Sequence, residues 1–101
     1  MKTIKMIKFG KYLSGRDNGR HAYDFFKKEI EKMPKDEQIF CDFQDVLLLA
    51  PSYCDEVFGE IQNELPGKLV IDESINNALK KAFEVVAEVR NLKFEYGKNK
   101  D

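Results

Sequence analysis

The densest run of apolar positions lies in the middle of the chain, over residues 39–58. Ile39–Cys41 has the pattern of a buried strand, an acidic turn follows at Asp42–Asp45, and Val46–Leu49 is apolar again. In a chain otherwise rich in Lys and Glu, a run this apolar has to be covered on both faces, as the central strand of a helix-covered sheet is. We therefore expect the rest of the chain to pack around this segment.

Apolar residues at spacings of three and four predict three amphipathic helices. The first covers 22–33, the second starts at Pro51 and ends before Pro66, and the third covers 75–89. Gly59 is expected to let a neighbouring element approach the second helix closely. The expected N-caps are Asp17 or Asn18, then Ser52 with Asp55 as its Ser-x-x-acid partner, then Asp72 or Ser74.

The apolar stripe of the third helix is expected to lie in the core. It consists of Ile75, Ala78, Leu79, Ala82, Phe83, Val86 and Val89. If the sheet covers only part of this stripe, the exposed part is a candidate contact for a homodimer or another protein partner.

Shorter apolar stretches predict further strands at residues 1–9, 12–13, 68–71 and 92–96. The alternation of strands and helices predicts an α/β fold with three helices and a mostly parallel sheet of about four to five strands, antiparallel at its N-terminal margin. We assign residues 1–97 to a single domain and 98–101 to a charged C-terminal tail. Ligand sites in such sheets form beyond the carboxyl ends of strands, which indicates the segments 14–20 and 50–53.

The charge balance excludes a protein that is drawn to polyanions by its overall field. Lys and Arg number 17 against 18 Asp and Glu, so the net charge is −1. We therefore expect neither nucleic acid nor a membrane as partner. Cys41 and Cys54 lack the paired spacing of a metal knuckle or of a disulfide framework, which favours a reducing compartment. The sequence shows neither a cleavable signal nor a run long enough to span a membrane. We therefore expect a cytoplasmic protein.

The segment from Ser14 to Arg20 reads as a polar loop that could hold a phosphate. Gly15 and Gly19 would let backbone N–H groups approach an anion, and Arg16 and Arg20 would add forked donors. The full Gly-x-x-x-x-Gly-Lys-Ser/Thr pattern is absent, so the preferred interpretation is an ordinary loop with solvated arginines, and the phosphate site is the alternative.

No catalytic constellation stands out in the sequence. His21 is the only histidine, and nothing in its spacing pairs it with a nucleophile. Asp42 and Asp45 suit a turn as well as an acid–base pair or a divalent ion. We expect no enzyme activity, no cofactor and no metal.

Three short motifs resemble the STAS domain of anti-sigma factor antagonists, and more closely a bacterial STAS-like family of unknown function. They are Ser14-Gly15-Arg16 before the first helix, Cys41-Asp42-Phe43 at a strand end, and the acid-x-x-Phe pattern of Asp55–Gly59; together they span roughly residues 4–90. The resemblance implies a STAS-like fold and a regulatory module that binds a protein partner, an ATPase-type kinase or a sigma-factor regulator. It also implies phosphorylation of a serine at the start of the second helix.

The expected contact surface is therefore the start of the second helix, at Pro51, Ser52, Tyr53 and Asp55. Ser52 is the phosphorylation candidate, although it stands one position after the place that the family pattern gives to the serine, and helix capping also explains it. Two alternatives stay open: a nucleotide- or phosphate-binding domain that uses Ser14–Arg20, and a small inhibitor that acts by surface occlusion.

Overall fold

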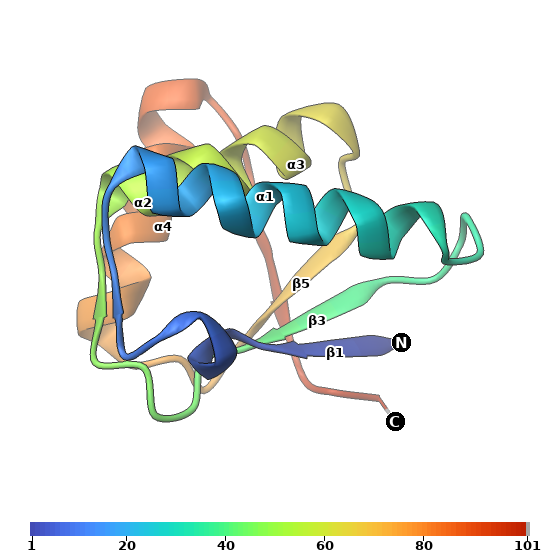
Figure 1. The fold of residues 1–101 in the computed structure, drawn as a ribbon, viewed down its shortest axis with the longest axis horizontal. Helices are drawn as coiled ribbons and strands as arrows, with labels where there is room; N and C mark the ends of the chain where they lie inside the picture. The colour runs from blue at the N-terminus through green and yellow to red at the C-terminus, as the bar shows by residue number, and fades with distance from the viewer. Residues whose placement is uncertain (101) are drawn as a thin grey trace.

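Four parallel strands form the main sheet of this α/β protein, in the order β1 (Lys2–Lys5), β3 (Ile39–Asp42), β5 (Leu69–Asp72) and β6 (Glu95–Gly97). The computed structural model describes residues 1–100 (Figure 1). β1 runs parallel to β3 with Lys2 opposite Ile39, so the expected antiparallel margin is wrong. The chain returns from β1 to β3 through a helix rather than a hairpin, and such a crossover makes the two strands parallel.

A second, two-stranded ribbon lies beside the sheet. β2 (Tyr12–Leu13) and β4 (Leu48–Leu49) are parallel, with Tyr12 opposite Leu48. In each strand one side chain is buried and the other exposed, because successive residues of a strand point to opposite sides. The 3₁₀ turn η1 (Met6–Phe9) connects β1 to this ribbon.

Three helical rods pack together, as the sequence predicts. The first is α1 (Arg16–Glu31) and the last is α4 (Asn77–Arg90). Between them, α2 (Pro51–Cys54), the π-helical turn η2 (Asp55–Gly59) and α3 (Glu60–Glu64) form one continuous rod, because the residues at both joints have helical backbone angles.

The helix starts differ from the expected caps. α1 begins at Arg16. The residue at its N-cap is Gly15, which has a positive φ of 85°, and neither Asp17 nor Asn18 caps the helix. Ser52 is the second residue of α2 and does not cap it either. At α4, Asn76 is the cap and its Oδ1 accepts a hydrogen bond from the Ala78 N–H at 2.7 Å.

The side chains expected to cap α1 and α4 bind elsewhere. Asn18 donates its side-chain N–H to the Ser14 carbonyl, at 3.1 Å. The Asp72 carboxylate accepts hydrogen bonds from the N–H and the hydroxyl of Ser74, which closes a turn before the helix starts.

All of the longer helices lie on one side of the sheet (Figure 1). β3 is buried on both faces, as expected, but helices cover only one of them. On the helix side, the rings of Phe26, Phe58 and Phe83 pack in a chain with centroid distances of 5.7 and 5.1 Å. On the other side, Phe40 and Val70 are opposite each other and nearly buried although no long helix covers them. Here the segment after β6 runs back beneath the strands, and the Asn99 side chain donates a hydrogen bond to the Thr3 hydroxyl at 2.8 Å.

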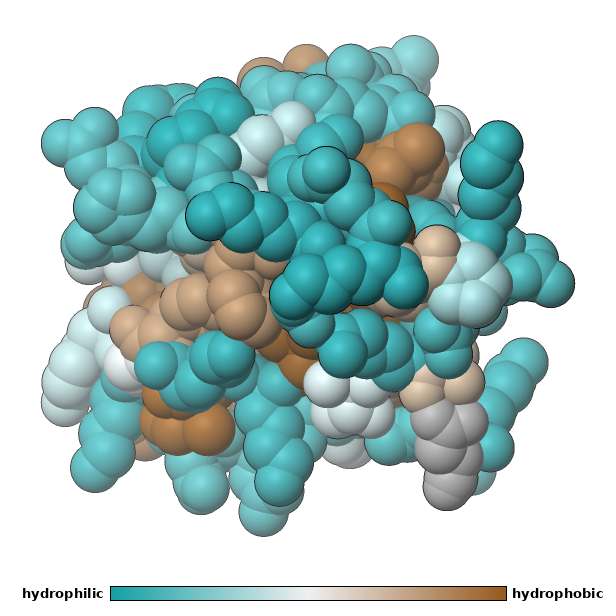
Figure 2. All heavy atoms as spheres, turned by 45° about the vertical axis from the view of Figure 1, so that its right-hand side comes forward, coloured by the Kyte–Doolittle hydropathy of each residue, from teal (hydrophilic) through white to brown (hydrophobic). Residues whose placement is uncertain are grey.

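Figure 2 shows one side of the molecule as largely hydrophilic, with an apolar band across it. Partly buried side chains that pack against the core include those of Ile7, Phe9, Phe25, Ile30 and Met33. Within residues 1–100 no helix is both long and apolar enough to cross a membrane.

Candidate functional site

The outer face of α4 carries two exposed valines. Val85 is 45% exposed and Val89 is 78% exposed, although Val89 was expected in the core. The buried stripe follows Leu79, Ala82, Phe83 and Val86 and then continues to Arg90, which turns inward to an acidic partner and leaves Val89 outside. Ala78 is exposed in the same way at the start of the helix.

The β2–β4 ribbon continues this apolar surface. Tyr12 and Leu48 are opposite each other and are 66% and 44% exposed. β4 contacts α4 on its other side, and Pro51 follows β4 directly. We call the surface formed by Tyr12, Leu48, Pro51, Val85 and Val89 the apolar end surface; its elements lie together at the left of Figure 1.

A hollow of about 180 Å³ opens in this surface, between the start of α2 and the last turns of α4. Its size suits one large apolar side chain of a partner. It is lined by Arg16, Pro51, Ser52, Asp55, Val85, Val86 and Val89. The hollow therefore brings together residues from both segments that the sequence singled out, the start of the first helix and the start of the second.

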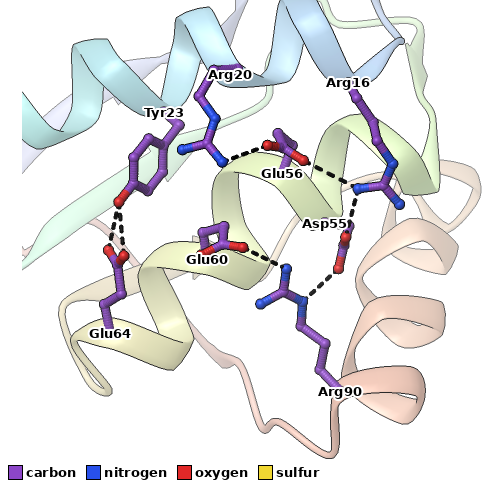
Figure 3. Close-up of polar contacts among 8 residues, drawn as sticks. All are labelled: Arg16, Arg20, Tyr23, Asp55, Glu56, Glu60, Glu64 and Arg90. Carbon is purple, nitrogen blue, oxygen red and sulfur yellow. Dashed lines mark hydrogen bonds and ion pairs between the residues drawn. The ribbon is translucent and has the colours of Figure 1, made fainter.

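An ion-pair network joins the three rods beside the hollow (Figure 3). Asp55 accepts hydrogen bonds from Arg16 at 2.8 Å and from Arg90 at 2.6 Å. Glu56 forms ion pairs with Arg16 at 3.2 Å and with Arg20 at 2.7 Å. Arg90 also donates a hydrogen bond to Glu60 at 3.0 Å. The hydrogen bond from Arg90 lowers the pKa of Asp55, and Asp55 in turn raises the pKa of Arg90.

Two glycines make room for this network. A Cβ on Gly59 would lie 3.0 Å from Nε of Arg90, so the expected close approach at Gly59 is confirmed. Gly19 was expected in a loop, yet it lies buried in α1, where a Cβ would be 2.9 Å from the Cβ of Glu56. The rods can approach this closely only where one of them lacks a side chain.

The arrangement argues against the alternative of a phosphate site at Ser14–Arg20. Only Ser14 and Gly15 precede the helix, and the Gly19 N–H already donates to the Gly15 carbonyl at 3.0 Å. The guanidinium groups of Arg16 and Arg20 are paired with carboxylates. The backbone donors and cations that a phosphate would need are thus partly engaged within the protein.

The four residues expected to contact a partner are placed unequally. Pro51 is exposed, while Ser52 and Asp55 are partly buried at the hollow. Tyr53 is only 2% exposed and belongs to the core, so it offers no surface to a partner. Burial also raises the pKa of Tyr53 to about 12.

The sequence analysis missed the acidic and basic partners that hold the site. Glu56, Glu60 and Arg90 are distant in sequence from Arg16 and Arg20, and their pairing depends on how the rods cross. The only local signal was the spacing of like charges by four residues, Arg16 with Arg20 and Glu56 with Glu60, which places each pair on one helix face.

A larger cleft of about 800 Å³ lies beyond the carboxyl ends of β3 and β5. Its two strand-end acids are engaged in their own turns: Asp42 accepts the Gln44 N–H at 2.9 Å, and Asp72 binds Ser74. Among residues 1–100 no group of three or more His, Cys, Asp or Glu side chains is placed to hold a metal ion. We therefore assign this cleft no chemistry.

The remaining candidates for chemistry are not brought together. Cys41 and Cys54 are free and buried, and burial raises the pKa of both thiols, which disfavours the reactive thiolate. His21 is exposed on α1.

The chain was compared with protein-family models, with curated proteins and with solved structures, and none of the three comparisons found a match. The α/β fold with its parallel sheet is confirmed by the structure, whereas the resemblance to the STAS family stays a prediction.

Proposed function

We propose that this protein is a non-enzymatic, regulatory interaction module that binds a protein partner through the apolar end surface. One observation carries the proposal. Among residues 1–100, four of the six large apolar side chains that are exposed lie on the connected elements β2, β4 and α4: Tyr12, Leu48, Val85 and Val89. Exposed apolar side chains that gather in this way are typical of interaction sites.

The surroundings of the surface suit binding. The hollow beside Pro51 can take one buried side chain, and a few such anchors supply most of the affinity in protein interfaces. The ion pairs from Asp55 to Arg16 and Arg90 tie the second rod, just after α2, to α1 and α4. A surface that is already rigid loses little conformational entropy when a partner binds.

The resemblance to STAS domains suggests the class of partner, an ATPase-type kinase or a sigma-factor regulator in a bacterial cytoplasm. It also suggests regulation through Ser52. A phosphate there adds a charge of about −1.5 to −2. Placed in the hollow beside Asp55, this charge would repel an acidic partner, and an apolar partner could fill the hollow only by removing water from the phosphate. An inhibitor that blocks its target by occlusion would use the same surface, and an activity assay of the captured partner separates the two.

Site-specific photo-crosslinking tests the proposal. A photoreactive amino acid at position 89 should crosslink a partner in lysate of the source cells, whereas the same group at position 31, exposed on α1, should not. Val89→Glu should weaken capture of the partner at least tenfold, because it places a charge where an apolar contact forms. The crosslinked bait is also examined by mass spectrometry for phosphate on Ser52.

A matched variant separates binding from nonspecific adhesion. Glu31→Lys changes the charge of an exposed position on α1 by two units, more than Val89→Glu does, and should leave capture unchanged. If every retained protein binds equally well to the wild type, to Glu31→Lys and to Val85→Glu/Val89→Glu, the apolar end surface is not the binding site.

A further inference from the structure

We propose that the apolar end surface is self-complementary and that two copies of this chain pair through it as a two-fold symmetric dimer. This inference rests on the proposed function, because it names one partner of the same surface. A two-fold interface requires that a single surface carry both a projection and the hollow that receives it.

The surface meets this requirement. Tyr12 projects from β2 with 66% of its side chain exposed, and the hollow lined by Pro51, Val85 and Val89 lies on the far side of β4. β4 separates the two features, since it pairs with β2 and contacts α4. Tyr12 is opposite Leu48, whereas the hollow lies three residues further along, beside Pro51. A two-fold axis that passes between Leu48 and Pro51 therefore places each Tyr12 over the hollow of the other copy.

The charges at the two ends of the surface are complementary under the same symmetry. β2 and α4 run in the same direction in Figure 1, so rotation by a half turn sets the start of β2 against the end of α4 of the second copy. Lys11 precedes Tyr12, and Glu88 precedes Val89. The rotation brings Lys11 of each copy to Glu88 of the other, and both are exposed without a salt bridge among the described residues.

Other charges do not oppose this pairing. Arg16 also lines the hollow, but its guanidinium is paired with Asp55 and Glu56 of the same copy. Lys81 lies toward the start of α4, at the end of the helix away from Lys11 of the second copy. The net charge of −1 adds little repulsion between two copies. The pairing would also bury the exposed valines that the monomer leaves in water.

Sedimentation of the purified protein over a wide range of concentration tests the dimer. The wild type should shift from 11.8 kDa to twice that mass as concentration rises. Lys11→Glu and Glu88→Lys should each raise the dimer dissociation constant about tenfold, because like charges then face each other twice in the interface. The double variant Lys11→Glu/Glu88→Lys should return the constant to near the wild-type value.

The controls are Lys28→Glu and Glu31→Lys, the same charge changes at exposed positions of α1. They should leave the dissociation constant unchanged. Protein that stays at the monomer mass at every concentration overturns the dimer, and so does a double variant that is weaker than either single variant. Val89-dependent capture of a different protein would survive both results, so failure of the dimer is distinguishable from failure of the proposed function.

Discussion

At the scale of single residues, Gly19 shows how packing reverses a local preference. In the sequence it belongs to a polar, glycine-containing stretch and indicates a loop. In the structure it faces the second rod, where the Tyr53 carbonyl oxygen would be 3.1 Å from an added Cβ and the Glu56 Cβ only 2.9 Å. The contact includes backbone, so it cannot be relieved by rotation of a flexible side chain.

Gly19→Ala should therefore destabilise the protein by about 1–3 kcal/mol, the usual cost of overpacking. Helix propensity alone predicts the opposite, a gain of about 0.5–1 kcal/mol. Urea unfolding of the variant decides between these signs. Lys28→Ala, at an exposed position of the same helix, should change stability by less than about 0.5 kcal/mol. A higher urea midpoint for Gly19→Ala would contradict the close contact.

Tyr53 illustrates the same limit on sequence interpretation. Its position two residues after Pro51 at a helix start suggested a contact residue, but helical spacing places it on the buried face with Val57 and Ile61. Helix periodicity could have assigned it to the core. Val89 was the converse case, since the stripe pattern could not show that Arg90 would take the inward position.

At the scale of elements, the positions of the helices and strands were predictable, and their pairing was less so. The stretch at Tyr12–Leu13 coincides with β2, and the stretch at 68–71 overlaps β5 (Leu69–Asp72) with a shift of one residue. The three rods correspond to the three predicted helices. The direction of β1 relative to β3 could not be predicted from its own residues, because the apolar pattern of a strand does not show which strand it will pair with. The start of α1 was hidden because Gly15 and Gly19 both resemble loop residues, although only Gly15 has a positive φ.

The segment after β6 is the element that covers the helix-free side of the sheet. Lys98 and Asn99 line one cleft together with Phe40, and Asn99 reaches Thr3 on the opposite edge strand. This segment explains how Phe40 can be 4% exposed on a face without a long helix.

Ending the chain after Gly97 should expose Phe40, lower stability by about 1 kcal/mol and increase binding of a hydrophobic dye. Thr3→Val, which removes only the hydroxyl that Asn99 contacts, should have a smaller effect on stability and no effect on dye binding. Urea unfolding and dye fluorescence measure both effects. Equal dye fluorescence for the shortened and the full chain would show that the segment does not shield this face.

At the scale of the whole molecule, carboxylates connect elements that are far apart in sequence. Asp55 joins α1 to α4, Glu64 joins α3 to α1 through Tyr23 and Lys27, and Glu29 joins α1 to β1. In each case the main cause of a lowered carboxyl pKa is a hydrogen bond. Tyr23 donates to Glu64, Lys2 donates to Glu29, and Arg90 donates to Asp55. None of these contacts was predictable from sequence, because each forms only when the rods are already packed.

These contacts predict the direction of acid unfolding. A carboxyl whose pKa is lower in the folded state than in the unfolded state binds fewer protons when folded, so it stabilises the protein more as pH rises. For Asp55, with an ordinary pKa of 3.8, the contribution is complete above that value and is lost as pH falls through the lowered pKa of the folded state. The free energy of unfolding should therefore fall on acidification below the ordinary carboxyl pKa values.

Asp55→Asn isolates this contribution. The variant should be less stable than the wild type at neutral pH by about 1–2 kcal/mol, because it loses the charged partner of Arg90 and Arg16 at a partly exposed site. The difference should shrink as the pH falls below 3.8 toward the lowered pKa of the folded state, where the wild-type carboxyl also becomes protonated. Asp36→Asn makes the same change in net charge at an exposed position that forms no ion pair among the described residues, and its stability should follow that of the wild type in parallel at every pH. If the two variants follow the same pH profile, the acid dependence reflects net charge alone, and the ties between the rods contribute nothing to it.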